Sequence, residues 1–458
     1  MLRLGAATIT SSSTVASATR RMILRGQMAG KLQASVSAAR ISTKTRDSST
    51  TPSSLWHSRR MFSSSIPYHN ASLYTWGTNN NGSLLQGDGS DSDSKIDSNG
   101  ILWEPQLASG AKHLDGKKVI DICCGHSETM TILEDGKVWV VGENKNGQLG
   151  LGHKDPVPIP TELKVDGVEK FRNGRIGVNT GALIAENGDL YTFGFGGSAL
   201  QGIGALGHGD GESYLTPKLV ESLVEDGCQV EDVALGESHT TVLTTDGDVL
   251  TTGAANYGRL GNGETSEDTL YFDAVEILPG ETITQIAGGE SFTLALTNEG
   301  VIYGWGKNAK GQIGTGYGLG VDMYASEQIP TPMEGDELAN RKVTKIAAGT
   351  HHSACVTSSG ELFWWGSSLH LEPFRVAEVL HTKIIDVACG LDYTLALSED
   401  HELYVWGAGK TGVLGVGPDT KNLNQAQRIR ALMGSDGEPQ KEIISLSAGS
   451  TLAACLVN

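Results

Sequence analysis

The sequence predicts an all-β protein, a seven-bladed β-propeller closed by pairing of its N- and C-terminal strands. Two short glycine motifs each recur seven times after residue 70, and the spacing between them is constant. The chain also begins and ends with complementary halves of one repeat. Gly occurs 60 times and Pro only 13 times, which indicates many tight turns rather than a disordered linker.

The first sixty residues differ in composition from the rest of the chain. They hold ten Lys and Arg and a single acid, Asp47, and are rich in Ser, Thr and Ala. No continuous apolar centre is present, so the segment is typical of an organelle transit peptide rather than of a secretory signal. Arg60 lies three residues before a cut after Phe62, which predicts a disordered mitochondrial transit peptide over residues 1–62. A plastid transit peptide and a tail without a targeting role are the alternatives.

The remaining 398 residues are strongly acidic. They carry 25 basic and 52 acidic groups, a net charge of −27. Nucleic-acid binding depends on Lys and Arg that neutralise phosphates, so we expect no direct DNA binding and rank RNA association last.

The cysteines and the hydropathy exclude further classes of protein. None of the six cysteines forms a C-x-x-C pair, which argues against a zinc site or a disulfide framework. No run of 18 or more apolar residues occurs, so we expect no transmembrane helix.

The repeat combines two motifs. The strand-Gly motif is a short apolar strand that ends in Gly, as in LYTWG and LFWWG. Its seven glycines are Gly77, Gly142, Gly194, Gly253, Gly306, Gly366 and Gly407. The Gly-turn motif is an apolar strand, a small residue, Gly and a second strand. Its seven glycines are Gly125, Gly177, Gly236, Gly289, Gly349, Gly390 and Gly449.

The two motifs define a rigid hairpin with variable connections. The interval from each Gly-turn glycine to the next strand-Gly glycine is identical in all six cases, from 125 to 142 in the first and from 390 to 407 in the last. Asp135-Gly136 and its equivalents lie between the two strands, and such pairs favour a two-residue turn with positive φ at both positions. The last copy has Asp400-His401, for which we expect a looser turn.

Four short strands in repeats of about 40 to 60 residues are typical of propeller blades. The chain starts with a strand-Gly motif at Leu73 and ends with a Gly-turn motif that reaches Val457. Seven complete blades result only if these two ends pair. The pairing would also remove an exposed sheet edge, and the propeller is expected over residues 71–458 as a monomer.

These motifs resemble the repeat of the regulator of chromosome condensation family. The resemblance rests on A-x-G-x-x-H-[ST], on the x-[LV]-[YF]-x-W-G strand and on G-x-x-x-x-G-x-L-G, over about residues 71–458. It implies a seven-bladed propeller with a shared closing blade. The family includes an exchange factor for the Ran GTPase, ubiquitin ligases, and mitochondrial members linked to ribosome assembly, RNA processing, respiratory-complex assembly or a GTPase.

The repeat copies depart from the family pattern in two respects. The motif histidine survives only as His239 and His352, and the copy at Gly366 lacks the G-x-x-x-x-G-x-L-G segment. Because the two histidines occupy equivalent positions, we interpret them as packing residues rather than as a catalytic pair.

No string in the sequence predicts catalysis or a cofactor. Residues 202–207 fit G-x-G-x-x-G, but the helix that would bind a pyrophosphate is absent. Gly409-Lys410-Thr411 imitates the end of a phosphate-binding loop without its leading Gly. We therefore expect no catalytic residue, no cofactor and no metal.

Three segments break the repeat and are the candidate partner-contact loops, because blade loops vary while hairpins do not. They are residues 87–103, which are acidic, 195–214, which are Gly-rich, and 317–340. A solvated surface loop is the plain alternative for each. The candidate contact residues are Asp91, Asp93, Phe195, Leu200, His208, Tyr317, Asp322 and Tyr324.

The sequence thus predicts a protein-interaction propeller in mitochondria, in the matrix or associated with the inner membrane. It would act as a scaffold or assembly factor, with a GTPase, the mitochondrial ribosome or respiratory-complex assembly components as partners. The alternative is a guanine-nucleotide exchange factor for an organellar small GTPase, which would act by loop insertion.

Overall fold

A computed structural model describes most of the chain after residue 70. The described ranges are residues 71–87, 95–263, 267–276, 281–316, 325–333, 335–433 and 442–458. The predicted transit peptide lies outside them. So do five candidate contact residues, Asp91, Asp93, Tyr317, Asp322 and Tyr324.

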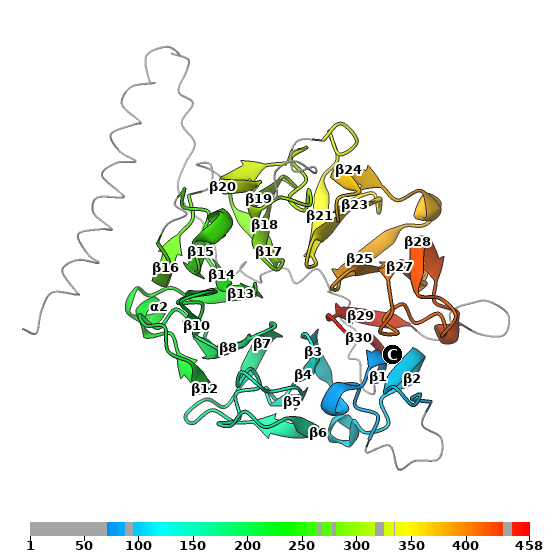
Figure 1. Ribbon diagram of the computed structural model, residues 1–458, viewed down its shortest axis with the longest axis horizontal. Helices are drawn as coiled ribbons and strands as arrows, with labels where there is room; N and C mark the ends of the chain where they lie inside the picture. Colours follow the sequence, from blue (N-terminus) through cyan, green and yellow to red (C-terminus); the bar gives the residue numbers. More distant parts are fainter. Residues whose placement is uncertain are drawn as a thin grey trace, which may run out of the picture. The chain divides into compact units, whose positions relative to one another are not determined.

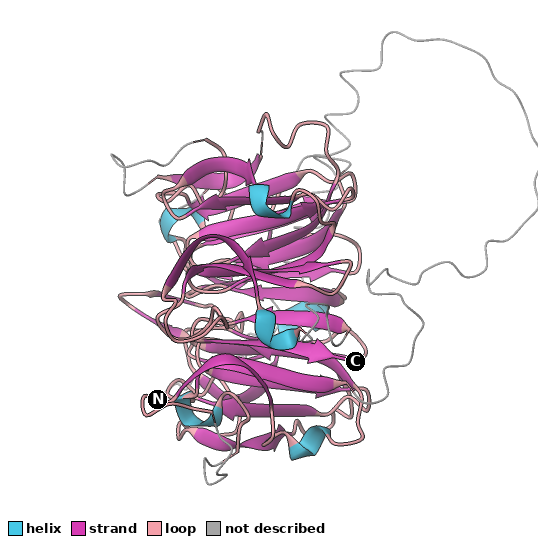
Figure 2. Ribbon diagram, turned by 90° about the vertical axis from the view of Figure 1, so that its right-hand side faces the viewer, coloured by secondary structure: helices cyan, strands magenta, loops and turns pink. Residues whose placement is uncertain are grey.

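The described residues form seven four-stranded antiparallel sheets arranged around a central axis (Figure 1). This confirms the predicted seven-bladed propeller. We number the blades along the chain and name the strands of each from the axis outward. Strands account for most of the structure, and the helices are short (Figure 2).

Blades 1 to 3 follow one another in sequence. Blade 1 contains β3 (Val119–Cys124), β4 (Glu128–Leu133), β5 (Val138–Gly142) and β6 (Val157–Leu163). Blade 2 contains β7 (Phe171–Ile176), β8 (Thr180–Ala185), β9 (Leu190–Gly194) and β12 (Tyr214–Leu219). Blade 3 contains β13 (Val230–Leu235), β14 (His239–Thr244), β15 (Val249–Gly253) and β16 (Thr269–Ala274).

Blades 4 to 6 have the same order. Blade 4 contains β17 (Ile283–Gly288), β18 (Phe292–Thr297), β19 (Ile302–Lys307) and β20 (Ser326–Pro332). Blade 5 contains β21 (Val343–Ala348), β22 (His352–Thr357), β23 (Leu362–Gly366) and β24 (His370–Arg375). Blade 6 contains β25 (Ile384–Cys389), β26 (Tyr393–Ser398), β27 (Leu403–Ala408) and β28 (Asn422–Arg428).

Blade 7 is assembled from both ends of the propeller sequence. Its strands are β29 (Ile443–Ala448), β30 (Leu452–Val457), β1 (Ser72–Thr78) and β2 (Ile101–Leu107). β1 pairs with β30 along its length, with Tyr74 opposite Cys455. The predicted closure by the two terminal strands is therefore confirmed.

The remaining elements are short connections. They are β10 (Gly197–Ser198), β11 (Gly202–Ile203), the helix α2 (Glu221–Glu225), and the 3-10 turns η1 (Asn80–Gly82), η2 (Lys112–Leu114), η3 (Asn256–Gly258), η4 (Ala377–Val379) and η5 (Arg430–Leu432).

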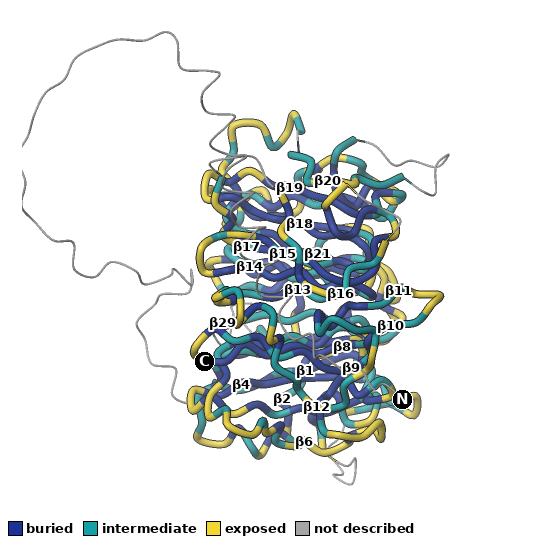
Figure 3. Tube along the Cα trace, turned by 90° about the vertical axis from the view of Figure 1, so that its left-hand side faces the viewer, coloured by how far each residue is buried: buried dark blue, intermediate teal, exposed yellow. Residues whose placement is uncertain are grey.

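The core lies in the second strand of each blade. Every residue of β4, β8, β14, β18, β22, β26 and β30 is buried. These strands are covered on both faces by neighbouring blades, which explains their lack of a polar and apolar alternation. Figure 3 shows this buried layer inside more exposed connections.

The hairpin turns differ from the prediction in backbone conformation. Only the glycine of each Asp-Gly pair has a positive φ, as at Gly136 (81°). The Gly136 amide bonds to the Leu133 carbonyl at 2.8 Å, and the Leu133 amide bonds to the Lys137 carbonyl at 3.0 Å. The loop therefore has three residues and ends in a left-handed glycine, while the Asp135 carboxylate accepts the Lys137 amide at 3.1 Å.

The turn at Asp400-His401 is not looser than the others, and that expectation was wrong. His401 itself adopts the left-handed conformation, with φ of 62°. It makes the same two backbone hydrogen bonds, both of 3.0 Å, to Ser398 and from Ser398 to Glu402. His is among the non-glycine residues that tolerate this conformation.

Candidate protein-interaction face

The chain direction places two kinds of connection on one face of the ring. Strands alternate in direction within a blade, so the turn after each first strand and the loop after each third strand leave on the same side. We call this side the loop face. The Asp-Gly hairpin turns lie on the opposite side.

The described connecting residues of two predicted contact segments lie on the loop face. Residues 95–100 lead into β2, and residues 195–213 connect β9 to β12. The segment 317–340 is not one loop, because β20 runs through it and pairs with β19, with Glu327 opposite Gly306. Residues 335–340 therefore follow β20 on the opposite face. Pro330 and Pro332 obscured this strand in the sequence, although proline is tolerated on an edge strand.

The loop of blade 2 presents a small hairpin to solvent. β10 and β11 pair through Gly197 and Ile203, and Leu200 at the tip is 95% exposed. The base is anchored, because the Ala205 carbonyl accepts the Thr240 hydroxyl of blade 3 at 2.7 Å. The result is a projecting apolar tip on a fixed base, which is suited to contact with a partner.

Phe195 and His208 are held within this loop. Phe195 is half-buried, and its amide donates to the Asn179 carbonyl at 3.0 Å. His208 Nε2 lies 2.9 Å from Thr192 Oγ1, and its ring packs edge-on against Tyr214. Burial lowers the pKa of His208 to about 4, so it is neutral at physiological pH. Of the three described contact candidates, only Leu200 is exposed.

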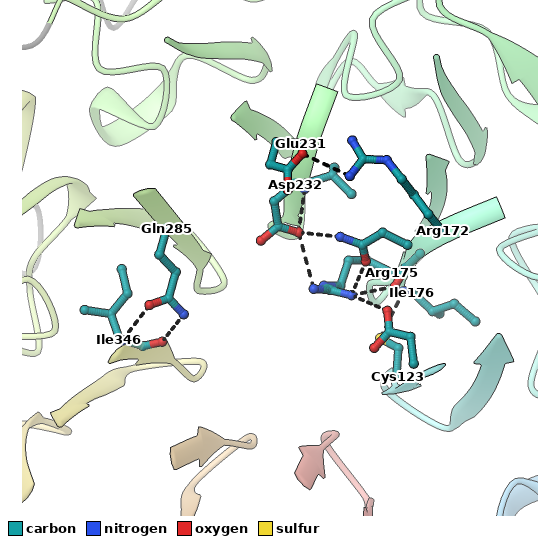
Figure 4. Close-up of polar contacts among 12 residues, drawn as sticks. Cys123, Arg172, Arg175, Ile176, Glu231, Asp232, Gln285 and Ile346 are labelled. Carbon is teal, nitrogen blue, oxygen red and sulfur yellow. Dashed lines mark hydrogen bonds and ion pairs between the residues drawn. The ribbon is translucent and has the colours of Figure 1, made fainter. Parts of the chain in front are cut away.

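Sequence reasoning missed a polar cluster on the first strands of the blades, around the central axis of the ring (Figure 4). Arg175 on β7 contacts Asp121 of blade 1 at 3.0 Å and Asp232 of blade 3 at 3.3 Å. Burial acts to lower the pKa of the Arg175 guanidinium, but Asp232 and Asp121 together raise it above its usual value. One side chain thus links three consecutive blades.

Further contacts link first strands of neighbouring blades around the same axis. The Ile176 amide donates to Cys123 Sγ at 3.4 Å, and the Ile346 amide donates to Gln285 Oε1 at 3.0 Å. Lys345 forms an ion pair with Asp386 at 3.5 Å between blades 5 and 6. Each of these groups already has a partner in a neighbouring blade, which explains the cluster as a set of links between blades.

His239 and His352 lie between blades. His239 Nε2 is 3.1 Å from Thr293 Oγ1 in blade 4, and His352 Nε2 is 3.0 Å from Thr394 Oγ1 in blade 6. Burial lowers their pKa values to about 3 and about 4. Both imidazoles are neutral and contact the next blade, as expected of packing residues.

The described part of the chain contains no set of three or more His, Cys, Asp or Glu residues positioned to hold a metal ion. All six cysteines are free thiols. Among the described helices, none has the length and apolar character needed to cross a membrane.

Comparison with known families identifies the repeat. The RCC1-like domain matches residues 64–372, and the regulator of chromosome condensation (RCC1) repeat matches residues 384–412. The chain belongs to the RCC1-like domain family. Solved RCC1 structures share this fold: yeast Prp20p aligns with a TM-score of 0.72 at 21% identity, covering 86% of this chain and 92% of Prp20p.

Several curated relatives align with part of this RCC1-like chain. The ultraviolet-B receptor UVR8 of Arabidopsis thaliana is 33% identical over 64% of this chain and 60% of its own length. The Arabidopsis mitochondrial protein RUG3 is 30% identical over 55% of this chain and 54% of its own length. The bovine secretion-regulating guanine nucleotide exchange factor is 32% identical over 50% and 48%. The chain thus spans between about half and three fifths of the length of each of these relatives.

Proposed function

We propose that this RCC1-like chain is a mitochondrial protein-interaction propeller that acts as a scaffold or assembly factor through its loop face. The carrying observation is the blade 2 hairpin, where an anchored base presents Leu200 to solvent. Loops that project from a rigid scaffold commonly carry binding residues. The charge of −27 over residues 61–458 opposes nucleic acid as the main partner.

The proposed location rests on residues 1–62 and on one relative. The segment has the charge and composition of a transit peptide, and RUG3 is named as mitochondrial. N-terminal sequencing of protein from isolated organelles should find a mature chain that starts near Ser63. An intact Met1, or enrichment in plastids, would contradict the proposal.

Co-purification from mitochondria, followed by mass spectrometry, tests the binding role. We expect Leu200→Asp to release specific partners such as ribosomal or respiratory-complex assembly components. The matched control is Ile159→Asp on the fourth strand of blade 1, because Ile159 is also highly exposed, at 70%. Equal partner recovery with both variants would exclude the hairpin as the contact.

Guanine-nucleotide exchange on an organellar GTPase is the second candidate. The projecting β10–β11 hairpin favours it, since exchange by loop insertion requires such an element. Prp20p is described with binding properties toward Gsp1p and histones, and one relative is named as an exchange factor. Release of labelled GDP should accelerate with wild type and Ile159→Asp but not with Leu200→Asp. No acceleration for any organellar GTPase would remove this candidate.

A further inference from the structure

Loops on the loop face close the boundaries between blades, which we call seams. In three blades the loop after the third strand offers a carbonyl to the indole of the next blade. Trp76 Nε1 donates to Val413 at 2.7 Å, Trp305 to Arg259 at 3.1 Å, and Trp365 to Gln312 at 2.9 Å. All three tryptophans are 0% exposed.

A second backbone bond fixes the end of the loop. In five blades the glycine that lies two residues after the L-G or I-G pair of the loop donates its amide to a carbonyl on the outer strand of the next blade. The acceptor directly follows the residue that pairs with the strand-Gly glycine of that blade. The pairs are Gly152 with Leu215 (2.8 Å), Gly209 with Leu270 (2.8 Å), Gly263 with Gln328 (3.0 Å), Gly316 with Leu371 (3.1 Å) and Gly417 with Trp103 (3.2 Å).

Blade 5 lacks this loop. Ser367 and Ser368 have φ values of 50° and 60°, and the Leu369 amide bonds to the Gly366 carbonyl at 3.0 Å. Positive φ at both central residues is the two-residue turn that joins adjacent strands directly. The connection after the third strand of blade 5 therefore does not reach blade 6.

The groups that would receive the loop are left open on blade 6. Trp406 occupies the place of Trp365 but is 7% exposed, and none of the residues that the structure describes accepts a hydrogen bond from its Nε1. Asn424 follows Leu423, which pairs with Gly407, so it is the equivalent of Leu371. Its carbonyl receives no loop amide.

Blade 5 compensates for part of the loss. In blade 4 the loop residue Ile313 packs over Gly304, where an added Cβ would lie 2.4 Å from Ile313 Cγ2. The equivalent of Gly304 in blade 5 is Trp364, a half-buried ring that packs against the core between blades 5 and 6. The indole replaces the apolar side chain of the loop but leaves Trp406 Nε1 and the Asn424 carbonyl unbonded by any loop.

We propose that the seam between blades 5 and 6 binds a glycine-containing loop of a partner protein, whose backbone bonds to Trp406 Nε1 and to the Asn424 carbonyl. This inference rests on the proposed protein-binding function and adds a second site to it. The other seams show the required shape. Glycine is needed because a Cβ at Gly258 or Gly311 would meet the outer strand of the next blade at 2.7 and 2.6 Å.

The borders of this seam favour an acidic loop. Lys310, whose carbonyl accepts the Ser368 amide at 2.9 Å, is exposed on the blade 5 side. Lys421, which directly precedes β28, is exposed on the blade 6 side. Leu369, 72% exposed, adds apolar surface. Two lysines on an otherwise acidic propeller are complementary to a partner loop that carries Asp or Glu.

The probe is a cyclic peptide with the sequence of residues 142–152, the loop of blade 1, in which Leu149→Gly leaves room for Trp364, flanked either by two Asp or by two Lys. It is titrated into the full chain with 15N-labelled tryptophan, and Trp406→Phe assigns the indole resonance. We expect a saturable shift of the Trp406 indole and tighter binding of the Asp-flanked peptide. Trp406→Phe should weaken binding about three- to tenfold, the range for one hydrogen bond.

The matched control is Trp365→Phe, which removes the same N–H where a loop is already in place. It should lower the melting temperature without changing the peptide affinity. A graft of residues 307–316 after Gly366, combined with Trp364→Gly, should fill the seam and abolish peptide binding.

An unmoved Trp406 resonance, equal affinity in Trp406→Phe, or binding by the graft would overturn the seam proposal. If partners still co-purify with wild type but not with Leu200→Asp, the proposed hairpin contact stands even though the seam proposal fails. If Leu200→Asp recovers the same partners as wild type while the Trp406 resonance shifts and saturates, the hairpin contact is rejected and the seam proposal stands.

Discussion

Blades 5 and 7 depart from the common pattern in opposite ways. Blade 7 is discontinuous in sequence, yet β1 and β30 pair along six residue positions, and Trp76 is fully covered by the loop of blade 6. Blade 5 is continuous in sequence, yet it sends no loop after its third strand to its neighbour and leaves Trp406 Nε1 without a loop carbonyl. A blade is therefore completed by its hydrogen bonds and by packing against its neighbours. A continuous stretch of sequence is neither necessary nor sufficient for this.

Removing residues 444–458 should have the largest effect, because it deletes β30 and most of β29. β1 would lose its partner, and the ring would open along an unpaired edge. The loss of the packing and hydrogen bonds of both strands should exceed the roughly 5–15 kcal/mol stability of a typical domain. We therefore expect aggregation or no cooperative melting transition. Soluble protein with an unchanged transition by circular dichroism would contradict it.

The stability of the seam between blades 7 and 1 should depend on pH through Glu128. Ser127 Oγ lies 3.1 Å from Thr451 Oγ1 of blade 7, and the buried Glu128 carboxylate accepts the Ser127 amide at 2.9 Å. Burial raises the pKa of Glu128 to about 7. The folded protein then keeps a proton that the unfolded chain releases, so the free energy of unfolding falls as pH rises from about 4.5 to about 7.

Glu128→Gln should remove this slope, which is on the order of 3 kcal/mol in all. Denaturant titrations at pH 5 and pH 8 give the change in the free energy of unfolding for each protein, and the contribution of Glu128 is the difference between wild type and variant. His239 and His352 have the opposite pH dependence, since their lowered pKa values reduce the free energy of unfolding as the pH falls below about 6.5. This contribution is the same in both proteins and cancels in the difference. Parallel pH profiles would show that Glu128 ionises normally.

Trp76→Phe should cost about 1 kcal/mol of the free energy of unfolding beyond the loss of ring packing, because it removes the 2.7 Å bond to the buried Val413 carbonyl. Chemical denaturation checks this value. A benzothienylalanine at position 76, which keeps the size of the ring system but lacks the N–H donor, should show the hydrogen-bond part of the loss, whereas a change due only to ring size would be absent.

Trp406→Phe should have the smallest effect, about 1 kcal/mol less than Trp76→Phe, since both variants lose the same ring atoms from the core but only Trp76 gives up an intramolecular hydrogen bond. The same denaturation series applies. A cost equal to that of Trp76→Phe would mean that the two seams are closed alike, and it would remove the distinction between blades 5 and 7.

Periodic features of the sequence predicted most of the fold. The constant interval between the glycine motifs and the complementary halves at Leu73 and Val457 indicated seven blades and their closure. Two local expectations failed. Asp135 does not take a positive φ, because its carboxylate caps a three-residue loop instead. The segment 317–340 contains β20, whose prolines concealed an edge strand.

Arg175 could have been recognised as an outlier. The same position in the other six first strands holds Cys123, Ala234, Ala287, Ala347, Ala388 and Ser447. The sequence could not name the partners, because Asp121 and Asp232 are 54 and 57 residues away. The pairing follows from three first strands meeting at the axis.

By itself, the sequence determined the repeat unit, the number of blades and the missing loop after Gly366, since these follow from turn chemistry and from spacing within a single repeat. Only the tertiary structure decided which connections share a face, that Trp364 replaces the missing loop, and that Trp406 is left open. Those outcomes depend on contacts between successive blades, because residues remote in sequence come together only once the ring has formed.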